Sequence, residues 1–356
     1  MTMDACIYDR LACPVHKTAV QRLGDMLVCA AGDTYPIVEN IPVMLVPDGQ
    51  QTIDSAEKTL QTARMPQPSA RPFDGPPYFV DTLGCSDQEK QEIRGELAAG
   101  HTAVDPVVSY LVGATNGILY KSVIGNLASY PVPELRLEPA AGERFLDIGC
   151  GWGRWCVAAA RKGYRPVGVD PSLGAVLAAR RVCEQLGVRA EFIVGDARHL
   201  PFADSSFDVV FSYSVIQHFS KPHARQTLAE IGRALSERGR SLIQMPNAYG
   251  IRSLQQQIRR GFRPGTRFQV RYWSVPELKR AFTAAIGDSV VSVDGYFGLG
   301  IQASDRALLP PTYRAIVTAS ETLRRFSRRA PWMCYFADSV YVQSKARRTA
   351  PAKSAG

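Results

Sequence analysis

Short apolar runs alternate with amphipathic stretches through the central part of the chain. The apolar runs, each short enough for a buried strand, are residues 144–148, 165–169, 190–194, 207–211 and 240–245. Stretches with helical periodicity separate several of them, at residues 154–162, 172–186 and 221–235. Strands that alternate with helices indicate βαβ crossovers, so this region predicts an α/β fold with a parallel sheet covered on both faces.

The pattern changes after residue 273. Ser274 and Glu277 form a capping-box pattern, which predicts a helix that runs to Ile286. Residues 289–296 and 335–343 are predicted as two late strands, and the alternation over residues 338–342 is typical of an antiparallel edge strand.

The same reading divides the chain into four parts. Residues 1–48 form a small unit rich in apolar pairs, and residues 49–100 are a polar, Pro-rich linker with short helical pieces. Residues 101–345 form the main domain, and residues 346–356 a disordered basic tail. Two basic stretches, near 246–273 and 297–332, interrupt the strand–helix rhythm and are interpreted as insertions.

Composition narrows the class of protein. The 356 residues are 46% apolar and 21% charged, which excludes a wholly disordered, collagen-like or coiled-coil chain. No apolar run approaches the ~18–20 residues of a membrane span, and the first residues do not resemble a secretory signal. Eight scattered cysteines favour free thiols in a reducing cytoplasm.

Charge is distributed unevenly. Residues 246–356 carry 18 Lys or Arg against 6 Asp or Glu, or +12, so the preceding residues carry −3 of the net +9. A basic C-terminal third attracts anionic partners such as phosphates, nucleic acid or an acidic membrane surface. The alternative is a solvated surface with no specific partner.

A glycine loop carries the first chemical signal. Gly149, Gly151 and Gly153 follow a predicted strand and precede a helix, so a ligand can lie against bare backbone. The third glycine of a dinucleotide fingerprint would fall at Arg154, so the pattern differs from that motif. Asp147, two residues before the loop, disfavours a pyrophosphate and favours a cationic ligand. A tight structural turn is the alternative.

Two further acids follow the next two predicted strands. Asp170 stands 23 residues after Asp147, where a carboxylate can accept both hydroxyls of a ribose. Asp196 can accept an adenine amino group, and the small Ala197 leaves room for the ring. Three acids at successive strand ends beside a glycine loop therefore predict a site for a cationic adenosine compound, and S-adenosylmethionine meets that description.

Five segments, in order, resemble the motifs of class I S-adenosylmethionine-dependent methyltransferases. They are residues 146–153, 169–172, 195–197, 200–202 and 206–210. The resemblance covers about residues 140–245 and implies a Rossmann-like sheet of seven strands, the last antiparallel. It implies that Gly149, Cys150 and Gly151 lie along the methionine moiety, that Asp170 holds the ribose, and that Asp196 with Ala197 holds the adenine. The predicted cofactor-binding set is completed by Asp147, Pro171, Ser212 and Tyr213.

The methyl acceptor should lie near the end of the fourth predicted strand. His218 is the candidate catalytic base, because its ordinary pKa of ~6.5 suits neutral pH. The alternative is that His218 only supports the next helix or shapes the site.

The leading hypothesis is methyl transfer to a small or carrier-linked, possibly anionic, metabolite. The alternatives are an RNA methyltransferase and a non-catalytic, cofactor-binding adaptor; no RNA-reading motif is present, and no oligomeric state follows.

The first 48 residues are similar to the small zinc-ribbon domain that activates methyltransferases. That family has two C-x-x-C pairs, which imply a tetrahedral zinc site. Here the pairs read Cys13 with His16 and Cys29 with Gly32, so the fourth ligand is missing, although Asp33 is adjacent. We therefore expect a degenerate ribbon held by its apolar core and no bound metal, with an intact zinc site as the alternative.

Overall fold

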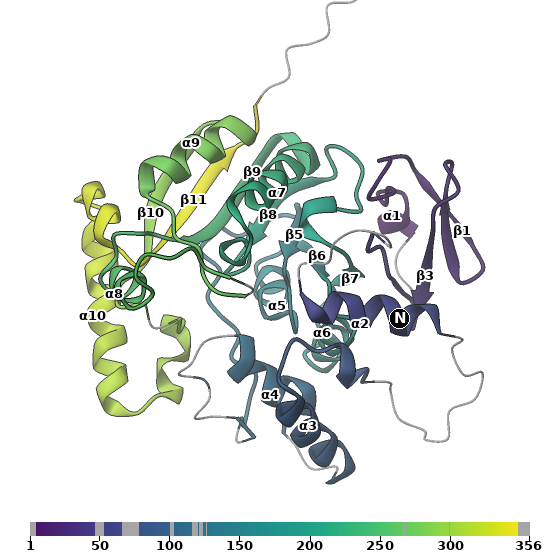
Figure 1. The fold of residues 1–356 in the computed structure, drawn as a ribbon, viewed down its shortest axis with the longest axis horizontal. Helices are drawn as coiled ribbons and strands as arrows, with labels where there is room; N and C mark the ends of the chain where they lie inside the picture. The colour runs from purple at the N-terminus through teal and green to yellow at the C-terminus, as the bar shows by residue number, and fades with distance from the viewer. Residues whose placement is uncertain are drawn as a thin grey trace, which may run out of the picture.

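The structure is a computed structural model, and its strands form two separate sheets (Figure 1). It describes residues 5–46, 53–65, 78–99, 103–115, 120, 124–125, 127–266, 268–298 and 300–347. The predicted tail falls mostly outside these ranges. Among the described residues, no helix is both long and apolar enough to cross a bilayer.

The large sheet has seven strands in the order β10-β11-β9-β8-β5-β6-β7. Their bounds are β5 Arg144–Ile148, β6 Arg165–Asp170, β7 Glu191–Val194, β8 Phe207–Ser212, β9 Leu235–Pro246, β10 Ser289–Gly295 and β11 Ser339–Lys345. The five strands β5 to β9 are parallel, and β11 is antiparallel to both of its neighbours. The predicted Rossmann-like α/β fold is confirmed.

One detail of the prediction was wrong. The last strand is antiparallel, but it lies inside the sheet between β10 and β9, and β10 is the edge. The strand also starts at Ser339, because residues Pro331–Phe336 form the 3-10 helix η6 instead. Alternation of polar and apolar residues shows that one face of a strand is more polar than the other. Here the half-buried Ser339 and the exposed Gln343 produce this alternation, although both edges of the strand are paired.

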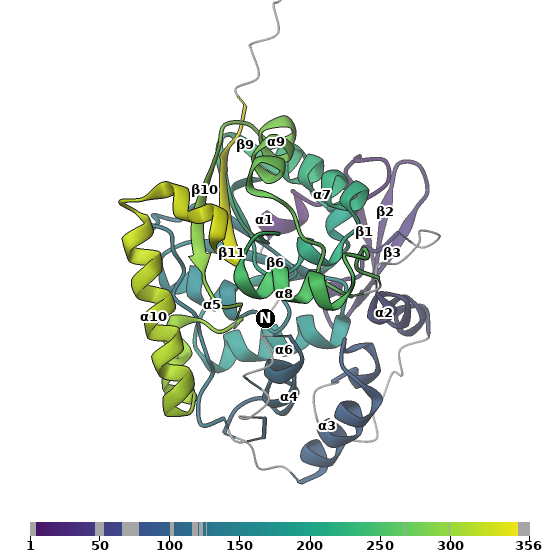
Figure 2. The same cartoon turned by 60° about the vertical axis from the view of Figure 1, so that its left-hand side comes forward.

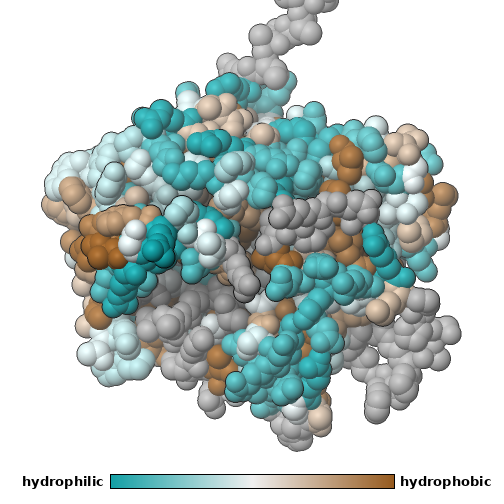
Figure 3. Space-filling model, in the orientation of Figure 1, coloured by the Kyte–Doolittle hydropathy of each residue, from teal (hydrophilic) through white to brown (hydrophobic). Residues whose placement is uncertain are grey.

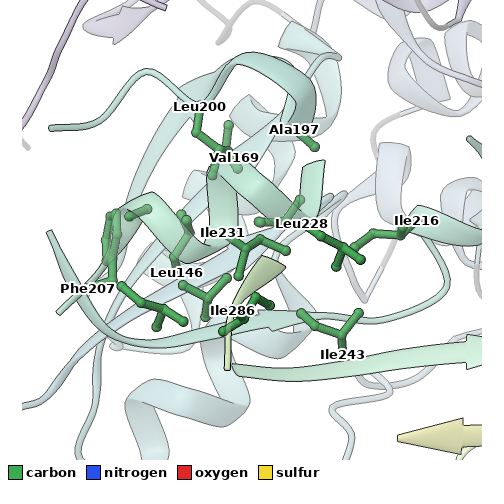
Figure 4. Close-up of a cluster of buried hydrophobic side chains, with 14 of the residues drawn as sticks. Leu146, Val169, Ala197, Leu200, Phe207, Ile216, Leu228, Ile231, Ile243 and Ile286 are labelled. Atoms are coloured by element: carbon green, nitrogen blue, oxygen red, sulfur yellow. The ribbon is translucent and has the colours of Figure 1, made fainter. Parts of the chain in front are cut away.

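Helices cover both faces of this sheet (Figure 2). Helices α5 (Arg154–Arg161) and α6 (Leu173–Gln185) pack on one face, and α7 (Lys221–Ala234) and α9 (Val275–Ala285) on the other. Successive strand residues point to opposite faces, so Leu146 joins the α7 side and Phe145 the α5 side. Figure 4 shows the α7 side, where Leu228 and Ile231 meet the sheet residues. The predicted cap of α9 is present, with the Ser274 hydroxyl accepting from the N–H of Glu277.

The segment predicted as a linker contains packed helices. It includes α2 (Asp54–Arg64), η1 (Val80–Thr82) and α3 (Asp87–Ala99), and α4 (Pro106–Thr115) follows. The hydroxyls of Thr59 and Thr82 accept hydrogen bonds from the N–H groups of Leu173 and Gly174 at 3.2 and 2.7 Å. These helices therefore buttress the start of α6, immediately after the end of β6.

The two basic stretches contain helices on the side of the sheet bounded by β10. Helix α8 (Ile251–Arg259) follows β9. Helices η5 (Ala303–Leu308), α10 (Pro311–Ser327) and η6 lie in the long connection from β10 to β11. Two further 3-10 helices, η3 (Ala197–His199) and η4 (Ile216–His218), follow β7 and β8.

The N-terminal residues form the small sheet. Its elements are α1 (Ala5–Tyr8), β1 (Val20–Leu23), β2 (Met26–Cys29), β3 (Thr34–Val38) and β4 (Ile41–Pro42). After β4 the chain runs along the outer edge of β7, where the N–H of Met44 donates to the carbonyl of Val194 at 2.8 Å. Lys17 forms a 2.6 Å ion pair with Glu230 of α7. The small sheet is thus docked against the β7 side of the large one.

Candidate active site

The glycine loop is closed on one side and open on another. Gly149 and Gly151 have φ of 73° and 51°, in the left-handed region that favours glycine. A Cβ on Gly149 would lie 2.2 Å from the Val215 side chain, so no other residue fits there. A Cβ on Gly151 would meet nothing within 4 Å. The loop therefore presents bare backbone to open space at Gly151.

Asp147 is a buried carboxylate that is incompletely paired. It is 1% exposed; Oδ2 accepts a 3.5 Å contact from the Cys156 thiol, and Oδ1 has no partner among the described residues. Burial raises the pKa of Asp147 to about 7, with a smaller contribution from Asp170. A buried carboxylate oxygen without a donor is unfavourable, so a cation or a donor that reached this oxygen would stabilise it.

Asp170 faces the same loop from the end of β6. Its two carboxylate oxygens accept from the N–H groups of Gly151 and Ser172 at 3.0 and 2.9 Å. Burial raises the pKa of Asp170 to about 6, against the lowering effect of these hydrogen bonds. Each oxygen retains a lone pair, so the carboxylate is held in place and can still accept from a diol.

Asp196 follows β7 at the start of η3 and is paired with Arg198, two residues further along the chain. Arg198 donates to it through Nη2 at 2.7 Å and through its main-chain N–H at 2.8 Å, and both side chains are buried. Ala197 is buried beside it. The three predicted acids thus lie in or just after three strands that are adjacent in the sheet, β5, β6 and β7.

These residues fit the predicted cofactor. S-adenosylmethionine carries a positive charge, a ribose diol and an adenine. The unpartnered oxygen of Asp147, the held carboxylate of Asp170 and the open backbone at Gly151 offer matching partners. The site residues themselves stay predictions.

For four other predicted cofactor-binding residues, existing hydrogen bonds or burial restrict how they could contact a ligand. The hydroxyl of Ser212 is buried and donates to the carbonyl of Ile148 at 2.9 Å, so only its main chain is left for a ligand. The hydroxyl of Tyr213 donates to Asp294 at 3.1 Å. Cys150 is buried, and burial holds the pKa of its thiol well above the ordinary value, so it stays protonated. Pro171 is half-buried next to Asp170.

His218 is engaged on both ring nitrogens. Its Nδ1 lies 2.7 Å from the carbonyl of Phe268, its Nε2 lies 3.2 Å from the Gln217 amide nitrogen, and its ring stacks on Phe268 at 3.8 Å. Burial lowers the pKa of His218 to about 4. The ring is therefore neutral at pH 7 and joins η4 to the stretch that follows α8. This arrangement favours the alternative in which His218 shapes the site.

Arg154 is a site residue whose role sequence reasoning missed. It is 5% exposed, its guanidinium lies over the rings of Trp155 and Tyr213 at 5.4 and 6.0 Å, and Nη1 has no partner among the described residues. In the sequence, Arg154 was noted only because it stands where the dinucleotide fingerprint has a glycine. Its role could have been inferred from its position, because an arginine at the start of an otherwise apolar helix is unusual.

Asp294 of β10 was missed as well. It is buried; Oδ1 accepts from Arg136 at 2.9 Å, and Oδ2 accepts from the hydroxyls of Tyr213 and Ser339 at 3.1 and 2.7 Å. Asp294 thereby fixes the Tyr213 ring, which follows the end of β8. A single acid in a mostly apolar predicted strand could have indicated a functional or structural role for Asp294. The partners that define this role lie far away in the sequence.

The small sheet contains a second cluster of chemically active side chains. One ligand atom each from Cys13, His16, Cys29 and Asp33 lies within 4.8 Å of all the others. The Asp33 carboxylate is 3.3 and 3.7 Å from the two sulfurs and 2.9 Å from His16 Nδ1. Tetrahedral zinc, with bonds of about 2.0–2.3 Å, places its ligand atoms about 3.3–3.8 Å apart. The cluster fits zinc, because Asp33 occupies the place of the ligand that the sequence reading counted as missing.

Comparisons with known proteins find similarity to methyltransferases. Residues 145–239 match the family described as "Methyltransferase domain". A ubiquinone biosynthesis O-methyltransferase from Azorhizobium caulinodans is 36% identical over 115 residues, or 32% of this chain and 40% of that protein. A demethylmenaquinone methyltransferase from Clavibacter sepedonicus is 36% identical over 137 residues, or 38% of this chain and 54% of that protein.

A solved structure, the YcgJ protein from Bacillus subtilis, matches 60% of this chain and 95% of its own at 23% identity and a TM-score of 0.39. This chain covers only about half or less of the length of the two enzymes named above. The similarity is therefore to a part of each of these enzymes.

Proposed function

We propose that this chain, whose residues 145–239 match the family described as "Methyltransferase domain", is a class I S-adenosylmethionine-dependent methyltransferase that transfers a methyl group to a small or carrier-linked anionic metabolite. The observation that carries the proposal is the unpartnered, buried carboxylate oxygen of Asp147 in the strand that leads into the glycine loop, whose backbone is open at Gly151. This strand and loop together offer an acidic group and close backbone approach. A cationic adenosine compound requires both.

Each acid then has a separate task. Asp170, already oriented by the N–H of Gly151, accepts the ribose hydroxyls, while Asp196 and Ala197 border the adenine. The loop from Gly149 to Gly151 sets the position of the methionine part. When bound, S-adenosylmethionine supplies an electrophilic methyl group for in-line displacement, so the main contribution of the protein is orientation.

Arg154 supports an anionic acceptor. A buried guanidinium that lacks a hydrogen-bond partner on one nitrogen is costly, and an incoming carboxylate, phosphate or phenolate would satisfy it. The charge of Arg154 lowers the pKa of Tyr120, Tyr213 and Asp147 against the larger effect of burial, so it acts on the same site as the predicted acids. The two relatives described above are named a ubiquinone biosynthesis O-methyltransferase and a demethylmenaquinone methyltransferase, and we extend to this chain an acceptor of the quinone class.

The same proposal includes one structural zinc ion in the small sheet, held by Cys13, His16, Cys29 and Asp33. The ion would join the two turns that carry these residues and contribute free energy to the folding of the unit. It lies in a different sheet from the glycine loop and takes no part in methyl transfer.

Ligand-induced stabilisation tests the cofactor assignment. S-adenosylmethionine or S-adenosylhomocysteine at 100 times its dissociation constant should stabilise the fold by about 2.7 kcal/mol, and NAD should have no effect. Absence of any shift would contradict the proposal. A shift without turnover on any acceptor, RNA included, would favour the adaptor alternative.

Arg154→Gln tests the acceptor. We expect a KM for an anionic acceptor raised at least tenfold, because a charge-assisted hydrogen bond contributes about 1.5–3 kcal/mol, with unchanged S-adenosylhomocysteine affinity. Arg161→Gln, at the exposed end of the same helix, is the matched control. Turnover on RNA that Arg154→Gln leaves unchanged would favour the RNA alternative.

A further inference from the structure

The apolar side of an amphipathic helix next to the site is left exposed by the residues that the structure describes. Ile251, Leu254 and Ile258 of α8 are 62%, 38% and 58% exposed. Their spacing of three and four residues places them on one side of the helix. Phe262, just beyond the helix, is 66% exposed and continues the apolar row.

A second exposed apolar group adjoins this helix. Trp332 and Phe336 of η6 are 63% and 57% exposed, and their rings meet edge to face at 6.2 Å. Asp338, two residues after Phe336, accepts from the N–H of Ser253 at 2.9 Å and so ties η6 to the start of α8. Figure 3 shows hydrophobic atoms beside hydrophilic ones at the left-hand edge of the view, over α8 and the adjoining end of α10.

We call this surface the α8–η6 patch. It consists of Tyr249, Ile251, Leu254, Ile258, Phe262, Phe326, Trp332, Tyr335 and Phe336. These are nine of the sixteen large hydrophobic side chains that are exposed among the described residues, so the exposure is concentrated rather than scattered.

The exposed charges in the two stretches that carry the patch have one sign, whereas the nearby Asp338 is buried. No acid occurs between residues 246 and 276 or between residues 322 and 337, while these stretches hold six and four arginines. Arg259, Arg263, Arg328 and Arg329 are exposed. An exposed apolar row framed by arginines and aromatic rings is complementary to an interface with an apolar interior and an anionic surface.

We propose that the α8–η6 patch docks the protein onto an anionic phospholipid membrane, with the apolar row inserted among the acyl chains and the arginines at the headgroups. Two copies of this chain would bring arginines against arginines, so a self-association through the patch is disfavoured. Single-stranded nucleic acid stacks its bases on aromatic rings, which the patch also has, but the aliphatic row of Ile251, Leu254 and Ile258 adds apolar surface that base stacking does not use and that acyl chains can cover.

Docking would also place the acceptor side of the site near the membrane. The stretch after α8 contacts η4 directly, through the N–H of Arg271 on the carbonyl of Gln217 at 2.8 Å and through Phe268 on His218. An acceptor with an apolar tail could therefore reach the site from the lipid surface. This last link rests on the proposed function; the docking itself does not.

Vesicle co-sedimentation of the full chain tests the proposal. The probes are unilamellar vesicles of phosphatidylcholine alone and with 30% phosphatidylglycerol. We expect binding to the anionic vesicles that falls as salt rises from 50 to 500 mM, and much weaker binding to the neutral ones. Arg259→Gln with Arg263→Gln should weaken binding by about fivefold for each arginine.

The apolar contribution needs its own variants. Ile258→Glu with Phe262→Glu should reduce binding more than tenfold, whereas Leu23→Glu, at a residue 63% exposed on the small sheet, should have no effect. Equal binding to both vesicle types, or equal loss with Leu23→Glu, would overturn the proposal. So would a dimer that Phe262→Glu dissociates in the absence of vesicle binding, or binding of oligonucleotides in place of vesicles.

S-adenosylhomocysteine affinity, measured without vesicles on the same proteins, separates the two proposals. Unchanged cofactor affinity in Ile258→Glu with Phe262→Glu shows that the variant is folded and that only docking was lost. Vesicle binding by a wild-type chain that binds no adenosyl compound would leave docking intact and refute the methyltransferase proposal.

Discussion

The carboxylate of Asp170, at the end of β6, accepts a 3.0 Å hydrogen bond from the main-chain N–H of Gly151 in the glycine loop. The acid proposed to hold the ribose is therefore already fixed against the loop proposed to hold the methionine part. Preorganisation of this kind reduces the ordering that ligand binding requires.

Asp170→Ala should weaken S-adenosylhomocysteine binding at least a hundredfold in calorimetry. The reason is the loss of two charge-assisted hydrogen bonds, each contributing about 1.5–3 kcal/mol. Asp87→Ala, at an acid in the first turn of α3 whose side chain is 92% exposed, serves as the control. Equal affinities for wild type and Asp170→Ala would refute the ribose assignment.

Asp147 predicts a pH dependence in the protein without cofactor. Its pKa of about 7 in the fold lies above its ordinary value of 3.8, so the folded state binds more protons than the unfolded state between about pH 4 and 7. The contribution of Asp147 to the free energy of unfolding thus decreases as pH rises through that window, by about 1.4 kcal/mol for each unit of raised pKa.

Asp147→Asn should remove this decrease. In urea titrations at pH 5 and pH 8, the variant should gain stability relative to wild type at pH 8 only, while its affinity for S-adenosylmethionine falls. Wild-type cofactor affinity should itself fall as pH drops from 8 to 6, because protonated Asp147 no longer attracts a cation. The same stability difference at both pH values would show that burial does not raise this pKa.

His218 distinguishes catalysis from positioning. If it holds the stretch after α8 through the carbonyl of Phe268, His218→Gln should raise the KM of the acceptor and keep most of kcat. The acid limb of the kcat profile should not move, since the pKa of His218 lies near 4. If His218→Gln instead lowered kcat more than a hundredfold and abolished the fall of kcat at acid pH, His218 would be the base.

The small sheet should contain one zinc ion per chain. We expect one equivalent by elemental analysis, a thiolate-to-metal absorption band after cobalt substitution, and a lower Tm after chelation. Asp33→Ala should weaken retention of the ion, whereas Asp25→Ala, at a residue 91% exposed beside the same hairpin, should not. A chain that takes up no metal even from excess zinc would support the degenerate ribbon predicted from sequence.

The strand–helix order was predictable because each element repeats a local period. Residues 144–148 and 289–296 were recognised as strands from their own composition, and the structure has them at β5 and β10. Sheet order was less accessible, since the placement of β11 between β9 and β10 depends on pairings about a hundred residues apart along the chain. Periodicity within residues 338–342 contains no information about such neighbours.

In the candidate site too, residues marked by local sequence were predicted, and residues whose role depends on distant partners were not. Asp147, Asp170 and Asp196 were found because each follows a recognisable strand. Arg154 and Asp294 were not, because their importance comes from partners such as Tyr213 that only the fold brings near. Asp33 was seen but not counted as a ligand, since its spacing differs from C-x-x-C and only the turn after Cys29 moves its carboxylate into place.

The position of β11 inside the sheet has a consequence for synthesis on the ribosome. Strands β5 to β9 can pair as soon as they emerge, but β9 then presents an unpaired edge until residues 339–345 are made. Strand β10, although made earlier, has no place in the sheet without β11. A nascent chain therefore carries an open, apolar strand edge for about ninety residues of elongation, about five to twenty seconds at typical rates, and this interval is when aggregation or chaperone capture is most favoured.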